Sequence, residues 1–500
     1  MRIPALSRPS NARAPEAAGN PDGTVSSRLL ARLFAPVDIA SLVVFRIVFG
    51  LLMFREMVRY FQDGLIRRWY IEPTFHFSYY GFDWVAPWPG GGMYIHFAAL
   101  ALLALGIALG LWYRVCTVLF FLGYTYVLLI DVAFYGHHYY LFALLSLLLA
   151  IVPAERALSL DARRRPGLRS DTVPAWALWA LRAQIGIAYI FSGLTKLQGD
   201  WLRGFPLGIW LAEETKFPII GHLFTKPWVI YAGTYGGLLL DLLIVPAMIW
   251  SRTRPFAFTA AVAFHLLNWQ FWTLASLPHV MIAGTALFFP PSWPRLGGLW
   301  QPVARPKTRS RKRGRQATVA PLSPPLSATQ RRTVALLGLY FTIQVLVPLR
   351  YYLFPGPARW TEEGYRFSWA MRSRSKVGTG SFTVEDRASG ETWEVNPWDD
   401  LAFRQADQML LHPDLILQYA HHLADRWRAA GYRDVEVRAN VYDSMNGRPY
   451  RRLIDPTVDL AAQPQTLLHQ MWVMPLTEPL PTEWRLGVKQ SDPPVIDDAR

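Results

Sequence analysis

The chain has 500 residues, of which 52% are hydrophobic and only 17% are charged, and it carries 21 Trp, 22 Tyr and 28 Phe. This composition excludes a disordered chain and argues against a wholly soluble one. The net charge of +15 does not indicate a nucleic-acid-binding face, because seven of the cations lie in one stretch from Arg305 to Arg315. The single cysteine, Cys116, excludes an intrachain disulfide and a thiolate-rich metal site.

Residues 1–35 are predicted to form a disordered tail, because their N-terminal part mixes Pro, Ala, Arg and Asn without an apolar core. Apolar runs follow, and a helix that crosses a bilayer needs about 20 mostly apolar residues. The candidate spans are Val37 to Tyr60, Met93 to Trp112, Val115 to Val132, Tyr139 to Val152, Trp176 to Lys196, Trp228 to Trp250, Pro255 to Leu274, His279 to Phe289 and Val334 to Tyr352. The fourth and eighth are short, so eight spans with a re-entrant segment are the alternative to nine.

Loop charges predict the orientation, since Lys and Arg collect in cytoplasmic loops. If the first span runs outward, the basic clusters at Glu155 to Asp171, Ser251 to Arg254 and Arg305 to Arg332 all face the inside. The predicted domains are a transmembrane helical domain at 36–295, a basic cytoplasmic loop at 296–333, a last transmembrane helix at 334–353 and an outward-facing domain at 354–500.

The segment after Phe354 has short mixed runs that are typical of a small α+β domain. It contains a predicted hairpin at Ser381 to Asn396, helices at Leu401 to Leu411 and Pro413 to Ala430, and strands at Val435 to Tyr442 and Arg448 to Ile454. The predicted fold class is therefore a polytopic α-helical membrane protein of about nine transmembrane helices with a small C-terminal α+β outer domain.

Lys196 ends an apolar run, where an ammonium is costly. It either snorkels to the membrane interface or is a desolvated amine that takes up a proton at neutral pH. Its position alone leaves both interpretations open. Asp241 is a second charge inside a span, and we expect it to pair with an arginine, Arg46 or Arg182, and so to hold the helices together.

Three histidines are further candidate site residues, and in the predicted topology His138 and Lys196 both lie at outer helix ends. His137 and His138 stand at the outer start of the fourth span, and His265 lies near the middle of the seventh. A hydrogen-bonded imidazole is the ordinary role for each. A metal site that adds His279 is the alternative, but no i, i+4 pair or flanking carboxylate supports it, so no metal is expected.

The motifs around these residues resemble those of the vitamin K-dependent gamma-glutamyl carboxylase family, from about Val37 to Val473. The resemblance rests on the following segments: Phe45-Arg46 with Phe49-Gly50, His138 to Leu141, Ala188-Tyr189 with Ser192-Gly193 and Lys196-Leu197 before Asp200-Trp201, Gly236 to Asp241, Phe264-His265 with Asn268 and Gln270, Ser292 to Arg295, Tyr365 to Met371, Asp407 with Met409-Leu410, and Arg452 to Asp459.

The resemblance implies a membrane enzyme, a carbon-carbon lyase, that carboxylates protein glutamate to gamma-carboxyglutamate. The reaction is coupled to O2-dependent epoxidation of vitamin K hydroquinone, a reduced menaquinone-type quinone, with O2 and CO2 as co-substrates. Residues 36–295 would then be the catalytic domain. In the family the lysine that matches Lys196 is the base acting on the hydroquinone, and the histidines that match His138 and His265 line the quinone site. His137 is the adjacent cofactor-binding candidate.

Partners implied in this way are the lipid bilayer and a peptide or protein glutamate of unknown identity, with no nucleic acid. The expected location is a bacterial inner membrane with the C-terminal domain in the periplasm. The chain departs from animal members, which carry Asn where His137 stands and hold a disulfide that one cysteine cannot make. Two alternatives stay open: a hydroquinone epoxidase or oxidase without peptide carboxylation, and a non-enzymatic quinone- or lipid-binding membrane protein.

Overall fold

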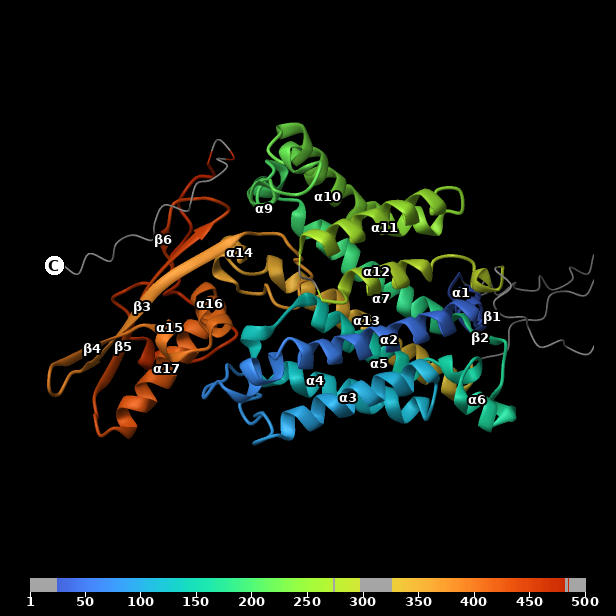
Figure 1. The fold of residues 1–500 in the computed structure, drawn as a ribbon, viewed down its shortest axis with the longest axis horizontal. Helices are drawn as coiled ribbons and strands as arrows, with labels where there is room; N and C mark the ends of the chain where they lie inside the picture. The colour runs from blue at the N-terminus through green and yellow to red at the C-terminus, as the bar shows by residue number, and fades with distance from the viewer. Residues whose placement is uncertain (1–24, 273–274, 297–325, 482–483, 485–500) are drawn as a thin grey trace, which may run out of the picture.

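The structure is a computed structural model that describes residues 25–272, 275–296, 326–481 and 484. A bundle of long helices lies at one end and a mixed α/β domain at the other (Figure 1). Most of the predicted N-terminal tail and of the predicted basic loop lies outside the described residues. The last part of that tail forms a helix, α1 (Val25–Phe34), where the sequence analysis expected disorder.

The helical end of the molecule contains one helix at each of the nine predicted spans. These helices are α2 (Ala40–Gln62), α3 (Gly92–Leu109), α4 (Tyr113–Ile130), α5 (His137–Ile151), α7 (Ala175–Lys196), α10 (Pro227–Ile249), α11 (Arg254–Phe271), α12 (Leu277–Ala286) and α13 (Ala328–Leu349). Shorter elements join them: α6 (Leu160–Arg164), α8 (Gly199–Leu202), α9 (Leu207–Glu213) and the antiparallel pair β1 (Pro36–Asp38) and β2 (Thr172–Pro174).

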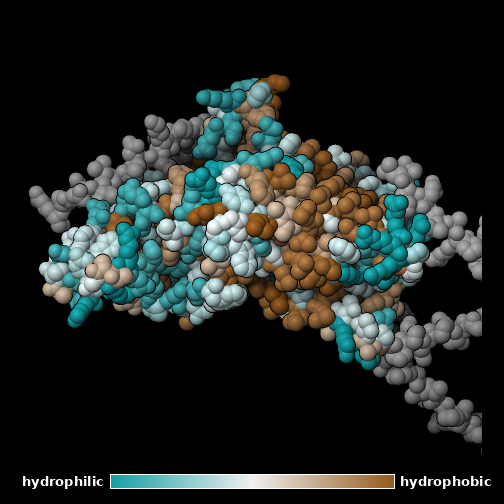
Figure 2. All heavy atoms as spheres, turned by 60° about the horizontal axis from the view of Figure 1, so that its bottom comes forward, coloured by the Kyte–Doolittle hydropathy of each residue, from teal (hydrophilic) through white to brown (hydrophobic). Residues whose placement is uncertain are grey.

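Five of these helices are long and apolar enough to cross a membrane: α3, α4, α7, α10 and the run Ala328–Tyr352 that contains α13. The helices α5 and α12 are apolar but shorter. Four charged side chains interrupt α2, and polar side chains near its end interrupt α11. Nine spans therefore remain a prediction. Figure 2 shows a hydrophobic surface over the helices between hydrophilic surfaces at the two ends of the molecule, as expected for a protein embedded in a bilayer.

The C-terminal domain is built on a four-stranded antiparallel sheet in the order β4-β3-β5-β6. Its strands are β3 (Lys376–Asp386), β4 (Glu391–Val395), β5 (Val435–Met445) and β6 (Arg451–Arg452), and its helices are α14 (Ala358–Thr361), α15 (Pro397–Asp400), α16 (Phe403–Leu411) and α17 (Pro413–Ala429). The predicted hairpin is confirmed, with Phe382 opposite Val395 and Val384 opposite Trp393. The last strand is shorter than predicted.

The domain packs on the loops at the nearby end of the bundle. Its hydrophobic core includes Phe77 and Val132, which belong to loops between the bundle helices. Asp131, at the end of α4, accepts a hydrogen bond of 2.7 Å from Gln405 on α16 and lies 3.1 Å from the imidazole of His76. These contacts fix the domain over the bundle, so that residues from both parts can share one site.

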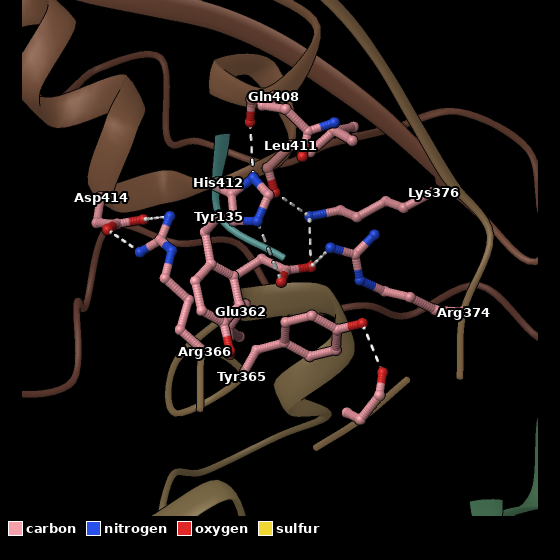
Figure 3. A network of polar contacts seen from close by, with 12 residues as sticks. Tyr135, Glu362, Tyr365, Arg366, Arg374, Lys376, Gln408, Leu411, His412 and Asp414 are labelled. Carbon is pink, nitrogen blue, oxygen red and sulfur yellow. Dashed lines mark hydrogen bonds and ion pairs between the residues drawn. The ribbon is translucent and has the colours of Figure 1, made fainter. Parts of the chain in front are cut away.

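A network of buried charges holds the interior of the domain together (Figure 3). The Lys376 ammonium, which is fully buried, donates to the carbonyls of Trp360 (2.8 Å) and Leu411 (2.6 Å). Arg374 lies 2.8 Å from the carboxylate of Glu362. Because β3 begins at Lys376, this network anchors the loop between α14 and β3, which faces the bundle.

Candidate active site

Lys196 lies at the C-terminal end of α7 and is 5% exposed. Its Nζ lies 2.7 Å from Asp241 Oδ2 on α10 and 2.7 Å from Ser192 Oγ, one turn earlier on α7. Ser192 donates its own hydroxyl hydrogen to the same carboxylate oxygen at 2.9 Å. The expected pairing of Asp241 with an arginine is wrong, because Lys196 is its partner.

The two arginines meet backbone carbonyls instead. Arg46 donates to the carbonyls of Ala154 (2.8 Å) and Leu158 (2.6 Å), and Arg182 donates to that of Leu287 (2.8 Å). A guanidinium has five donors in a planar fork, so it can donate to several carbonyls at once. An ammonium is more compact and needs only three acceptors, which the Asp241 and Ser192 pair supplies.

His265 lies on α11 and pairs with a tyrosine on α7. Its Nε2 is 2.6 Å from Tyr189 Oη, which in turn lies 3.0 Å from Thr285 Oγ1 on α12. Thr285 donates its hydrogen to the carbonyl of Met281, so Tyr189 donates to Thr285 and His265 donates through Nε2. This chain assigns the other ring nitrogen of His265, Nδ1, as an acceptor.

His137 and His138 begin α5, and the structure gives them different partners. The His137 Nδ1 lies 2.8 Å from Tyr135 Oη, which accepts from the backbone amide of Phe367. The Tyr135 hydroxyl hydrogen has no other acceptor among the described residues, so it is donated to Nδ1, and the proton of His137 lies on Nε2. That nitrogen is buried and has no hydrogen-bond partner among the described residues.

The His138 ring occupies space that a glycine provides. A β-carbon at Gly136 would stand 2.7 Å from the His138 ring, so any larger residue there would displace the imidazole. His138 packs against Tyr139, with ring centroids 3.9 Å apart.

One cavity of about 270 Å³ joins Lys196 and all three predicted histidines. Its remaining wall is mostly apolar and aromatic, and it includes Trp201, Trp210, Trp272 and Met281 from the bundle. Met371 and Arg372 reach it from the loop that precedes β3. The cavity thus lies where the bundle meets the C-terminal domain, among α5, α7, α10, α11 and α12.

The end of α7 is tied to the C-terminal domain at three successive points. Arg359 donates to the carbonyl of Thr195 at 3.0 Å, and Gln198 donates to that of Ser373 at 3.1 Å. Asp200 then accepts two hydrogen bonds from Arg448, at 2.7 and 2.9 Å. Lys196 lies between the first two ties, so the domain fixes the helix end that carries the amine.

His279, the fourth histidine of the metal alternative, lines a different cavity with Phe258 and Trp293. In the part of the chain that the structure describes, no group of three His, Cys, Asp or Glu side chains is arranged to hold a metal ion.

Comparison with known families follows this division of the molecule. Residues 34–293 match the HTTM domain, and residues 329–479 match the lumenal domain of vitamin K-dependent gamma-carboxylase. The chain belongs to the vitamin K-dependent gamma-carboxylase family. It is an integral membrane protein with a lumenal-type C-terminal domain. No solved structure matches it.

Three side chains of the cavity were not predicted from the sequence to be site residues. Tyr189 and Ser192 precede Lys196 by seven and four residues, so they lie on its face of α7, and this spacing was a readable signal. Arg372 carried no such signal, because only the packing of the domain on the bundle brings it to the cavity.

Proposed function

We propose that the chain carboxylates protein glutamate to gamma-carboxyglutamate, coupled to O2-dependent epoxidation of vitamin K hydroquinone. The observation that carries the proposal is the buried Lys196 amine, held by Asp241 and Ser192, on the wall of an apolar cavity shared with three histidines. Family membership supports a carboxylase-type enzyme. The cavity fits a quinone ring, since its walls are aromatic and aliphatic and its polar groups are few.

The hydroquinone, when bound, supplies with O2 the strong base that no side chain can provide for a carbon acid. Lys196 Nζ would accept the proton of a hydroquinone hydroxyl. As an ammonium it has three donors and three acceptors in contact: the Asp241 carboxylate, the Ser192 hydroxyl and the Ser192 carbonyl. To act as a base it must first release a proton, and Asp241 is the acceptor in direct contact.

The histidines would bind the quinone oxygens. His137 presents a buried Nε2–H without a partner among the described residues, and His265 presents an acceptor at Nδ1. A preorganised donor in a site without water stabilises negative charge where it develops on an oxygen. The centroid of the Trp201 ring lies 5.3 Å from the Lys196 amine.

A product assay on the purified chain tests the proposal. Hydroquinone, O2, labelled CO2 and a glutamate peptide are supplied, and both quinone epoxide and fixed label are measured. Both products should form, and Lys196→Ala should form neither. Epoxide without fixed label would reduce the function to a hydroquinone epoxidase, and neither product in the wild-type chain would leave only a binding protein.

We also propose that the C-terminal domain faces outward, into the periplasm if the membrane is a bacterial inner membrane. The matched domain is lumenal in type, and the basic clusters of the sequence lie on the other side in this orientation. Reporter fusions after Arg315 and after Gly390 should report opposite compartments. The same compartment for both would contradict the orientation.

A further inference from the structure

Arg372 is a cation in the wall of the Lys196 cavity. Its guanidinium carbon lies 5.2 Å from the ring centroid of Trp210 and 4.8 Å from that of Trp272, and the two indoles stand at 72° to each other. The cation therefore sits in a corner of two aromatic rings, which holds it in place. Burial lowers the pKa of Arg372 to about 10, so it stays charged at neutral pH.

The other arginines of this loop have partners that Arg372 lacks. Arg366 pairs with Asp414 and Arg374 pairs with Glu362. Among the described residues, neither a carboxylate nor a hydrogen-bond acceptor meets the guanidinium of Arg372. A half-buried guanidinium that rests only on aromatic rings keeps unused N–H donors, and these donors match a carboxylate in a planar fork.

The charges of the cavity wall point to the same kind of ligand. Lys196 and Asp241 neutralise each other as an ion pair. With the imidazoles neutral, Arg372 leaves the wall with one positive charge that nothing in it balances. A hydroquinone is uncharged, so it does not balance this charge either. An anionic second ligand does.

The backbone around Arg372 is held in an unfavourable conformation. Arg372 has a φ of 49°, and Phe367 and Trp369 in the same loop have φ values of 64° and 61°. Such a conformation is strained for a residue other than glycine and persists only where the surroundings fix it. Here Gln198, two residues after Lys196, donates to the carbonyl of Ser373 and ties the loop to α7. Arg372 is thus held at a set position relative to the amine.

We propose that Arg372 binds the side-chain carboxylate of the glutamate that enters the cavity from the C-terminal domain. This inference rests on the proposed function and names its substrate-binding residue. The guanidinium would hold the carboxylate close to the cavity that contains Lys196. It would also favour the second negative charge that arises when CO2 adds to the same side chain.

Direct binding tests the proposal without turnover. The full chain, in nanodiscs of zwitterionic lipid, is titrated into a fluorescein-labelled pentapeptide with a central glutamate between alanines, and into the same peptide with glutamine. Anisotropy gives both affinities. The wild-type chain should prefer the glutamate peptide by about tenfold or more, as a charge-assisted hydrogen bond provides. Arg372→Gln should lose this preference, and Arg372→Lys should keep part of it.

Arg426→Gln is the matched control, because Arg426 lies 5.1 Å from the Trp427 ring but outside the cavity. It should bind both peptides as the wild-type chain does. Unfolding midpoints of all variants show whether each is folded, and Arg372→Lys provides the comparison if Arg372→Gln is not. Arg372→Gln with the wild-type preference for glutamate would overturn the proposal, and so would a wild-type chain without any preference. Fixation of labelled CO2, measured separately, reports on the proposed function itself.

Discussion

Two buried lysines, one in each half of the molecule, have nearly the same immediate partners. The Lys196 Nζ lies 2.7 Å from Asp241, and the Lys376 Nζ lies 2.9 Å from Asp443. Each amine also lies 5.3 Å from the centroid of a tryptophan ring. In burial and in the nearest carboxylate the two sites are alike, although Lys376 also lies 3.8 Å from Glu362.

The two lysine sites differ in their remaining hydrogen-bond acceptors and in whether a cavity lies beside the amine. The Lys376 ammonium also donates to two backbone carbonyls, and the Lys376 side chain is 0% exposed. The Lys196 amine donates to the hydroxyl and to the backbone carbonyl of Ser192 on its own helix, and it borders a cavity. A buried ion pair therefore does not identify a functional lysine. What distinguishes Lys196 is the cavity beside its ion pair.

Replacing each lysine by methionine should separate these roles. Lys376→Met leaves Asp443 buried without its cation, whereas Glu362 keeps Arg374, so we expect a loss of about 3–5 kcal/mol of stability. Lys196→Met leaves Asp241 beside a cavity that can admit water, so its loss should be smaller, about 1–2 kcal/mol. Thermal unfolding in detergent measures both. Equal losses for the two variants would remove the distinction.

The cavity histidines should matter for turnover more than for folding. His138→Ala and His265→Ala should each slow epoxide formation by roughly 10² to 10³, because a preorganised donor or acceptor on the quinone oxygens is lost. His279→Ala, in the separate cavity, is the control and should leave turnover near the wild-type rate. Added EDTA should have no effect. Loss of activity on chelation, restored by zinc or iron, would make the histidines metal ligands.

Asp241→Asn should slow epoxide formation less than the histidine substitutions do. The amide keeps the shape of the site but removes the carboxylate that holds the Lys196 amine and that would take its proton. We expect turnover to fall by about 10- to 100-fold, the cost typical of a misplaced catalytic group. Initial rates of epoxide formation measure it. An unchanged rate would show that Lys196 works without its partner.

The pH dependence of stability should report on the buried charge network around Lys376 in the C-terminal domain. Burial raises the pKa of Asp443 from 3.8 to about 6, in spite of the Lys376 ammonium. Between these values the folded chain holds a proton that the unfolded chain has released, so this contribution to stability falls as pH rises. Relative to Asp443→Asn, the wild-type chain should lose about 2 kcal/mol between about pH 4 and pH 6. A relative gain over this window would mean that Lys376 keeps the carboxylate charged.

The sequence predicted the elements well because their signals are local. Apolar runs located the helices of the bundle, and the alternation of Phe382 with Val384 located the hairpin. The position of Lys196 at the end of an apolar run marked it as unusual before any neighbour was known. These features depend on residues close together in the chain.

The partners across the site could not be predicted in this way. Which cation contacts Asp241 depends on how α7 packs on α10. The sequence places both arginines and a lysine in the apolar helices, and it does not show which of them lies beside Asp241. Arg372 joins the cavity only through the packing of the C-terminal domain on the bundle. Such contacts join segments that are far apart in the chain. Local patterns in a single sequence do not show which distant segments meet.

The central claim is that Lys196 acts as a base and not as a fixed charge. Lys196→Arg tests it most directly, because a guanidinium keeps the positive charge beside Asp241 but stays protonated and cannot accept a proton. With purified, folded protein and saturating hydroquinone, we expect epoxide formation by Lys196→Arg to fall to the level of Lys196→Ala. Near-normal turnover by the arginine variant would contradict the account and leave Lys196 a charge contact.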